Sequence, residues 1–223
     1  MPREMYIGGS PSDRVVRRVS DFTGAAGGAV GPQGTWIVSE GDAMLAGTDL
    51  GPLATAIDNA PYNHVLSTGV APASGKYYGE ILVIVGTNIV IEVGVTELDT
   101  RFGAGVPAGN SGSSALGYNF ANGTRRTDLG GSTASPGLGT WPGDEKGVIL
   151  QVAYDGPGAK LSVGFNGSFG TQDPSAGTGT AFSGFTVSGD VRLCVALYSK
   201  YDTAILPATL TYTPPSGFTT WGS

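Results

Sequence analysis

Few residues of this chain could carry nucleophilic or metal chemistry, because it contains one histidine and one cysteine. His64, in the run PYNHVL, is the sole imidazole available as a general base, and no Gly-x-Ser-x-Gly sequence exists to present a serine. A single cysteine excludes a zinc site built from thiolates, and a single histidine excludes one built from imidazoles. We therefore expect neither a catalytic triad nor a bound cofactor or metal ion.

Two weaker patterns use carboxylates. Glu97-Leu98-Asp99 resembles the start of the Glu-x-Asp-x-Glu strand of some glycoside hydrolases, whose retaining mechanism needs two carboxylates about 5 Å apart. The last acid is replaced by Arg101, and a guanidinium cannot protonate a leaving group. Oxygen atoms of Asp99, Asn119 and Asp128 could bind calcium, although no twelve-residue loop pattern orders them. We regard a hydrolase as the less favoured alternative and expect solvated carboxylates in the loops.

Binding chemistry is better represented, because aromatic rings and guanidinium groups on loops bury contact area at low entropic cost. The candidate ligand-binding residues are Trp141, Arg125, Arg126, Tyr118 and Tyr201. Three of them also have a structural interpretation. Trp141 could close an edge of a sheet, and Arg125 and Arg126 follow the turn signal Asn122-Gly123, where a solvated hairpin end is the favoured reading.

The composition is that of one turn-rich β domain. The 223 residues include 40% hydrophobic residues, which suffices for a large core, together with 38 glycines and 13% charged residues. A formal charge of −6 argues against nucleic acid as the main partner. No apolar run reaches the ~18 residues of a membrane span, and the N-terminus lacks the apolar region of a secretory signal, so we expect no membrane insertion.

Residues 1–34 read as an extended N-terminal arm. Glycine-rich spacers surround one short basic and apolar run, formed by Arg14, Val15, Val16, Arg17 and Arg18. Residues 1–20 hold four arginines against Glu4 and Asp13, a balance of +2. The segment is either a partly ordered terminus or an arm that contacts a neighbouring subunit.

The most regular pattern lies between Gly143 and Gly170. Two alternating apolar runs are separated by Gly-Pro-Gly and closed by Asn166-Gly167, whose residue types suit the two positive φ angles of a type I′ turn. One face would carry Val148, Leu150, Val152 and Tyr154 from the first run and Leu161, Val163 and Phe165 from the second. This pattern predicts a central antiparallel hairpin.

Five further segments show periodicity or turn signals. Lys76–Val85 and Ile89–Val95 are separated by a loop of hairpin length, Gly86-Thr87-Asn88. Val191–Leu197 predicts a strand with Cys194 on the face opposite its inward residues, Ala208–Tyr212 predicts the last strand, and Pro52–Ile57 is the only plausible helical turn. Strands joined by turns with almost no helix predict a β-sandwich or barrel.

An ordered set of short motifs resembles SPRY domains over roughly residues 60–220. The motifs are GKYYGEI (75–81), VGV (93–95), LGY (116–118), GDEKGVILQVAYD (143–155), KLSVGFNG (160–167) and VRLCVALY (191–198). The closing LTYTPPSGF (210–218) is similar to the ending of SPRY-like domains in tailed-phage and prophage proteins. The chain departs from the pattern at Gly79, where the family usually has Trp, and in a long glycine-rich insertion after Phe102.

The resemblance implies an all-β, concanavalin A-like jelly roll of two antiparallel sheets, here residues 35–223, which binds through loops and is not an enzyme. It also implies a virion protein of a phage, such as a capsid decoration, head-fibre or tail component, made in the host cytoplasm. Its partners would be other virion proteins, reached through the arm, and further copies of itself. The alternative is a tail-fibre module that binds a host receptor or surface glycan.

Overall fold

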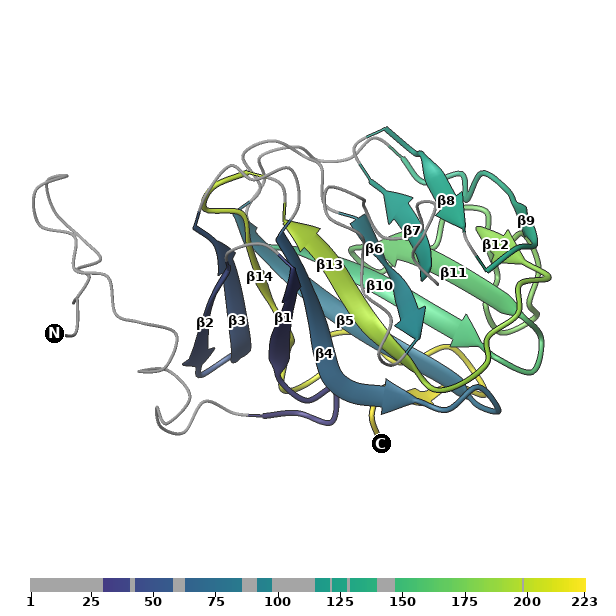
Figure 1. The fold of residues 1–223 in the computed structure, drawn as a ribbon. Helices are drawn as coiled ribbons and strands as arrows, with labels where there is room; N and C mark the ends of the chain where they lie inside the picture. Colours follow the sequence, from purple (N-terminus) through teal and green to yellow (C-terminus); the bar gives the residue numbers. More distant parts are fainter. Residues whose placement is uncertain are drawn as a thin grey trace, which may run out of the picture.

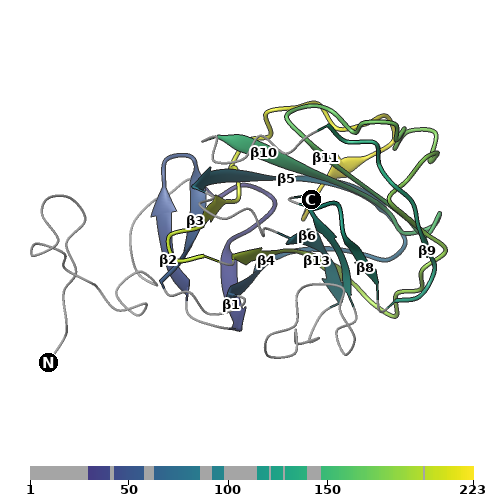
Figure 2. The same ribbon diagram turned by 90° about the horizontal axis from the view of Figure 1, so that it is seen from above.

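The described part of the chain is a sandwich of two β-sheets. A computed structural model describes residues 30–40, 43–57, 63–85, 92–97, 115–120, 122–127, 129–139, 147–197 and 199–223 (Figure 1). These residues form strands and turns and contain no helix, so no helix among them could span a membrane. Figure 2, seen from above, shows the two sheets as separate layers. The prediction of an all-β sandwich is confirmed.

The first sheet has six antiparallel strands. Their spatial order is β1 (Trp36–Glu40), β4 (Asn63–Ala71), β13 (Val191–Leu197), β6 (Glu92–Glu97), β7 (Ala115–Asn119) and β8 (Arg125–Thr127). The first and last strands of this order, β1 and β8, form its two edges.

The second sheet has nine strands. The order along it is β2 (Ala43–Thr48), β3 (Gly51–Ala56), β14 (Thr203–Ile205), β5 (Lys76–Val85), β10 (Val148–Asp155), β11 (Lys160–Phe165), β12 (Phe182–Ser183) and β9 (Ser132–Thr133). The remaining strand, β15 (Thr219–Thr220), pairs with β5 in parallel, whereas the other pairs are antiparallel. Side chains of both sheets interdigitate between the layers in one large buried cluster, as expected for strands whose residues alternate between faces.

The predicted central hairpin is confirmed, as is the tight turn at Asn166-Gly167 that follows it. β10 and β11 pair with Val152 opposite Val163 and Tyr154 opposite Leu161, which places the predicted apolar faces together. Asn166 and Gly167 have φ angles of 48° and 84°, and Phe165 and Ser168 exchange two backbone hydrogen bonds across them. The Asn166 side chain also accepts a hydrogen bond from the Ile149 N–H at 2.9 Å. Positive φ is cheap at Asn and Gly, so the sequence sets this turn locally.

The predicted hairpin between Lys76–Val85 and Ile89–Val95 is wrong. β5 belongs to the nine-stranded sheet, where it pairs with β10, β14 and β15, while β6 pairs with β13 and β7 in the other sheet. The connecting residues lie outside the described part of the chain. Two strands that are apolar on both faces suit any central position, so their periodicity could not identify their partners.

Two other local predictions are wrong for the same kind of reason. Pro52–Ile57 is not a helical turn but most of β3, which pairs with β2 on one side and β14 on the other. A helix of two turns is marginal by itself, so pairing on both edges outweighs it. Ala208–Tyr212 is not a strand. The N–H groups of Thr211 and Tyr212 bond to the side chain of Glu80 instead of to a neighbouring strand.

Strand β13 confirms the predicted inward face, since Val191, Leu193, Val195 and Leu197 are fully buried. Cys194, on the other face, is fully buried as well and contacts Leu66 and Ala115 in a smaller cluster. Both faces of this central strand are therefore buried. The alternation of the sequence predicted burial of one face only.

Candidate binding groove

The side chain of Gln33 occupies a gap along one edge of β5. On this edge β14 pairs with Leu82–Val85 and β15 pairs with Tyr77 and Tyr78, which leaves the backbone of Glu80 between them. The Gln33 amide donates to the Glu80 carbonyl at 3.1 Å and accepts from the Glu80 N–H at 2.8 Å. A side-chain amide thus makes the two bonds that a neighbouring strand would make, which satisfies buried backbone groups.

Gln33 also joins three segments that are distant in sequence. Its Nε2 donates a second hydrogen bond to the Pro207 carbonyl at 3.3 Å, and its own carbonyl accepts from the Gly69 N–H at 3.1 Å. Only 1% of its surface is exposed. Residues 30–34, which we assigned to the N-terminal arm, therefore include a part that packs into the sandwich, while the boundary at residue 34 itself stays a prediction.

The carboxylate of Glu80 is buried completely and binds the C-terminal segment. Its Oε2 accepts the Thr211 N–H at 2.8 Å, and its Oε1 accepts the Tyr212 N–H at 2.9 Å and the Tyr78 hydroxyl at 2.7 Å. Three donors on two oxygens compensate for the loss of water around a charge. Thr211 and Tyr212 are thereby fixed against the outer face of the nine-stranded sheet, where Figure 2 shows the C-terminal segment in yellow.

A chain of hydrogen bonds extends from this carboxylate to the central hairpin. The Tyr78 hydroxyl accepts from Gln151 Nε2 at 2.7 Å, and Gln151 Oε1 accepts from the Gly167 N–H at 2.7 Å. Burial, reinforced by the hydrogen bond to Glu80, raises the pKa of Tyr78 far above its usual value, so its hydroxyl stays protonated and donates. The network links the Asn166-Gly167 turn, β5 and the C-terminal segment.

A groove of about 440 Å³ lies above this network. It is lined by Pro32, Gln33, Pro207, Ala208, Thr209, Leu210, Thr211, Tyr212, Thr213, Pro214 and Thr220. The lining contains four threonines, one aromatic ring and no Asp, Glu, Lys or Arg. Within the described ranges the hydroxyls of these threonines make no hydrogen bond to protein, so they are free to bind water or a ligand. The groove is suited to a neutral ligand with both polar and apolar parts.

The residues that we predicted to bind a ligand are not gathered in this groove. Tyr118, on β7, is 5% exposed and its ring contacts Phe120 edge to face in the core at a centroid distance of 5.0 Å. Burial raises its pKa, while the charge of Arg125 acts in the opposite direction. Arg125 lies opposite Tyr118 on the edge strand β8. Trp141 and the side chain of Arg126 lie outside the described residues.

Tyr201 is exposed, but it lies far from Arg125 in the order of strands. Its N–H bonds to the Ala56 carbonyl at the end of β3, whereas β8 forms the opposite side of the sandwich (Figure 1). Its φ of 77° is unusual for a tyrosine, and Lys200 Nζ lies 5.3 Å from its ring centroid. Ligand binding by these residues stays a prediction, as does the role of the arm residues 14–18, which are outside the described part.

The residues considered for catalysis or metal binding are also dispersed. His64 is buried in β4, and burial lowers its pKa to about 4, so it is neutral at pH 7. Glu97 ends β6, while Asp99, Arg101 and Asp128 lie outside the described residues. Asn119 is buried in β7. Among the residues that are described, no three His, Cys, Asp or Glu side chains are grouped as a metal site would require.

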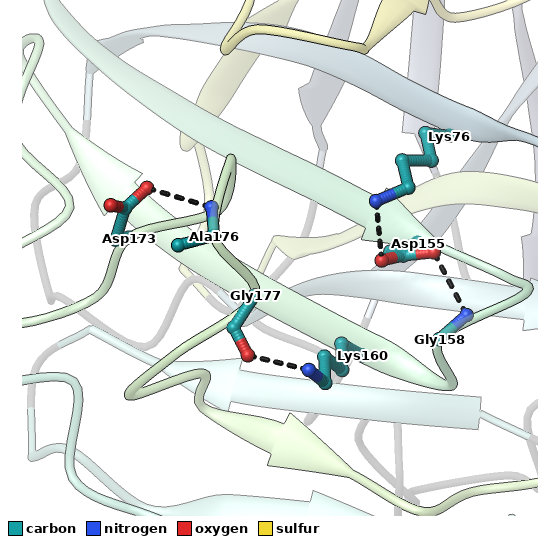
Figure 3. Close-up of polar contacts among 7 residues, drawn as sticks. All are labelled: Lys76, Asp155, Gly158, Lys160, Asp173, Ala176 and Gly177. Carbon is teal, nitrogen blue, oxygen red and sulfur yellow. Dashed lines mark hydrogen bonds and ion pairs between the residues drawn. The ribbon is translucent and has the colours of Figure 1, made fainter.

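Charged side chains at the β10–β11 turn stabilise loops (Figure 3). Lys76 and Asp155 form an ion pair at 2.9 Å, and Asp155 also accepts the Gly158 N–H at 2.9 Å. Lys160 donates to the Gly177 carbonyl at 2.6 Å, and Asp173 accepts the Ala176 N–H at 3.1 Å. Each of these four charged side chains thus makes a contact that stabilises a turn or loop.

Similarity to solved structures agrees with this architecture. The SPRY domain of human HERC1 matches with a TM-score of 0.53 and 16% sequence identity over 72% of this chain and 90% of that chain. The fold is SPRY-like. A second human SPRY domain matches with a TM-score of 0.43 and 11% identity over 79% of this chain and 99% of that chain. Neither a family model nor a curated protein matches the sequence.

The sequence analysis did not identify Gln33 or Glu80 as important residues, although the position of Glu80 in the sequence is unusual. It is the only charged residue inside the run YYGEILVIV, and a lone carboxylate within a central strand implies buried hydrogen-bond donors. Nothing in the sequence identified Gln33 or the Thr211 and Tyr212 N–H groups as its neighbours, because they lie 47 and more residues away.

Replacing Glu80 with Gln tests the carboxylate as the anchor of the C-terminal segment. The variant loses the charge and turns an –NH₂ group toward donors, so we expect a loss of about 2–4 kcal/mol in the free energy of unfolding. Denaturant titration measures it, with the exposed Asp49→Asn as the control that should change by less than about 0.5 kcal/mol. Equal stability of the two variants would contradict the assignment.

The lowered pKa of His64 predicts a pH dependence of stability. The unfolded state, with a histidine pKa of 6.5, binds more protons than the folded state, with a pKa of about 4, throughout this interval. Stability from this group is thus complete above pH 6.5 and falls as the pH decreases towards 4, by about 3 kcal/mol at most. The unfolding free energies of the wild type and of His64→Gln should converge as the pH falls from 6.5 to 4. If the two plots of unfolding free energy against pH are parallel, the lowered pKa of His64 is refuted.

Proposed function

We propose that this chain is a non-catalytic binding domain, a SPRY-like sandwich that engages another protein. The observation that carries the proposal is the combination of this fold with a preformed, uncharged groove whose walls are held by Gln33 and Glu80. A groove fixed by buried hydrogen bonds loses little entropy on binding, which favours recognition of a partner. The buried, neutral His64 is consistent with a structural role for the single histidine.

The more specific proposal is a structural protein of a phage particle: a capsid decoration, head-fibre or tail component. It rests on the resemblance of the closing residues 210–218 to phage proteins and on the arm-like composition of the N-terminal residues. In this proposal the N-terminal segment attaches the protein to other virion proteins and the sandwich faces outward.

Particle incorporation tests this role. We expect the full chain, but not a variant lacking residues 1–29, to co-sediment with density-gradient-purified particles and to label them in immunogold electron microscopy. The truncation ends ahead of Gln33, so all of the hydrogen bonds of Gln33 remain and the melting temperature should be kept. A matched internal control, Thr186→Arg on an exposed loop, should incorporate normally. Full incorporation of the truncated protein would exclude attachment through this segment.

A second candidate function is binding of a neutral glycan, as in a receptor-binding module. The specific observation that favours it is the set of four threonine hydroxyls beside Tyr212 in a groove whose lining bears no charge. Sugars combine hydroxyl groups with apolar ring faces, and these pair with hydroxyls and an aromatic side chain.

The glycan candidate predicts a hydroxyl-dependent affinity. Thr209→Val with Thr213→Val removes two hydroxyls and keeps the shape of the groove, so binding on an array of neutral oligosaccharides should weaken about tenfold. Thr186→Val is the matched control outside the groove. If no neutral glycan is bound by the wild type, or the double variant binds equally well, a glycan site in this groove is excluded.

A further inference from the structure

Exposed apolar side chains gather along one side of the sandwich. Among the described residues, the large hydrophobic side chains that are exposed are Val30, Ile37, Val38, Leu50, Ile57 and Tyr201. They belong to the entry of the chain, to β1, to the two ends of β3, and to the connection into β14; β1, β3 and β14 lie in the left half of Figure 1. Val30 is 62% exposed and Leu50 59%.

Among the described residues, the same part of the sandwich contains the first strand of each sheet. β1 is the first strand of the six-stranded sheet and β2 the first of the nine-stranded sheet. In the part of the chain that the structure describes, β2 pairs with β3 alone. Its sequence, AMLAGT, has neither a charged residue nor a proline, the usual protections of an edge strand. The free edge of β2 can therefore accept another strand.

The N-terminal residues of the chain fit this edge in charge and in reach. Residues 36–57 contain Glu40, Asp42 and Asp49 and no Lys or Arg, a formal charge of −3, whereas Arg14-Val15-Val16-Arg17-Arg18-Val19 carries +3. The segment alternates imperfectly, but its three valines favour a strand. The 29 residues ahead of Val30 could span about 95 Å when extended, which is long enough to reach a neighbouring copy.

We propose that residues 14–19 of one copy add as a strand to β2 of a neighbouring copy. Main-chain hydrogen bonds would supply affinity and the opposite charges would set the orientation. A strand of six residues that pairs with β2 is too small to cover Ile37, Leu50 and Tyr201 in addition. If the strand comes from a second copy, the sandwich of that copy is brought close to these exposed residues. The inference rests on the proposed role of the N-terminal segment in assembly and names its partner as a second copy.

Cysteine cross-linking tests the proposal, because the single native thiol, Cys194, is buried. We would purify Val16→Cys and Gly47→Cys separately, mix the full-length chains and oxidise them. Gly47 is an exposed position of β2. The expected result is a disulfide-linked pair containing one copy of each variant. The matched control mixes Val16→Cys with Thr186→Cys, which lies on an exposed loop and should give at least tenfold less product.

Three results would overturn the proposal. No product above the control excludes pairing at β2. If the mixture gives no pair but a chain that carries both Val16→Cys and Gly47→Cys forms the disulfide within itself, the segment folds back on its own copy. A product from Gly47→Cys alone, without the mixed pair, means that two β2 edges meet directly.

Sedimentation velocity provides a second measurement without new thiols. We expect the wild type to associate and Arg17→Glu with Arg18→Glu to weaken association at least tenfold, with partial recovery on adding Asp49→Arg. A wild type that is monomeric at all concentrations would overturn the proposal. Incorporation into particles is measured separately, so a protein that fails these tests but still enters particles refutes the pairing and leaves the proposed function intact.

Discussion

The structure depends on how β5 is completed along one edge. β14 leaves this edge after Ile205 and β15 joins it only at Tyr77 and Tyr78, so the intervening peptide groups would be unpaired without the Gln33 amide. The carboxylate of Glu80 then holds the C-terminal segment over the same position. An uncompensated buried amide or carboxylate costs several kcal/mol, so the N-terminal turn, the central strand and the C-terminal segment must form together.

The same constraint explains why the chain departs from the SPRY pattern at position 79. A Cβ atom on Gly79 would lie 2.7 Å from Gln33 Oε1 and 2.6 Å from Leu193 Cδ1, so a larger side chain would displace Leu193 and the amide that bonds to Glu80. The neighbouring part of the core contains a large aromatic side chain from the C-terminal segment, that of Trp221. Trp221 is fully buried, and its ring centroid lies 6.3 Å from that of Tyr77 and 6.0 Å from that of Tyr154. The C-terminal segment thus supplies aromatic volume next to a position where β5 has none.

The sequence predicted those features whose causes are local. The β10–β11 hairpin follows from alternation and from the Gly156-Pro157-Gly158 connection, and the turn after β11 follows from Asn166 and Gly167, which tolerate positive φ; these signals lie close together in the sequence. Strand partners across the sandwich could not be read, because β5, β6 and β3 pair with segments distant in sequence and apolar strands do not encode which neighbour they take. The groove was unpredictable for a related reason. Its walls come from residues 32–33 and 207–220, and they are joined by the Gln33–Pro207 hydrogen bond and by the bonds that Glu80 makes to both segments.

The placement of Pro32 and Gln33 also limits how binding and assembly can be separated. These residues form a wall of the groove, and the chain that precedes them enters the sandwich beside the exposed Val30 and Leu50. The Leu50 carbonyl accepts the Ala208 N–H, so the turn before β3 and the groove share a backbone contact. A change in residues 30–34 would therefore disturb the groove, β5 and the apolar side together. Changes ahead of Val30 remove none of the groove residues or of the hydrogen bonds described for them, so we expect that an assembly function can be removed there while a binding function is kept.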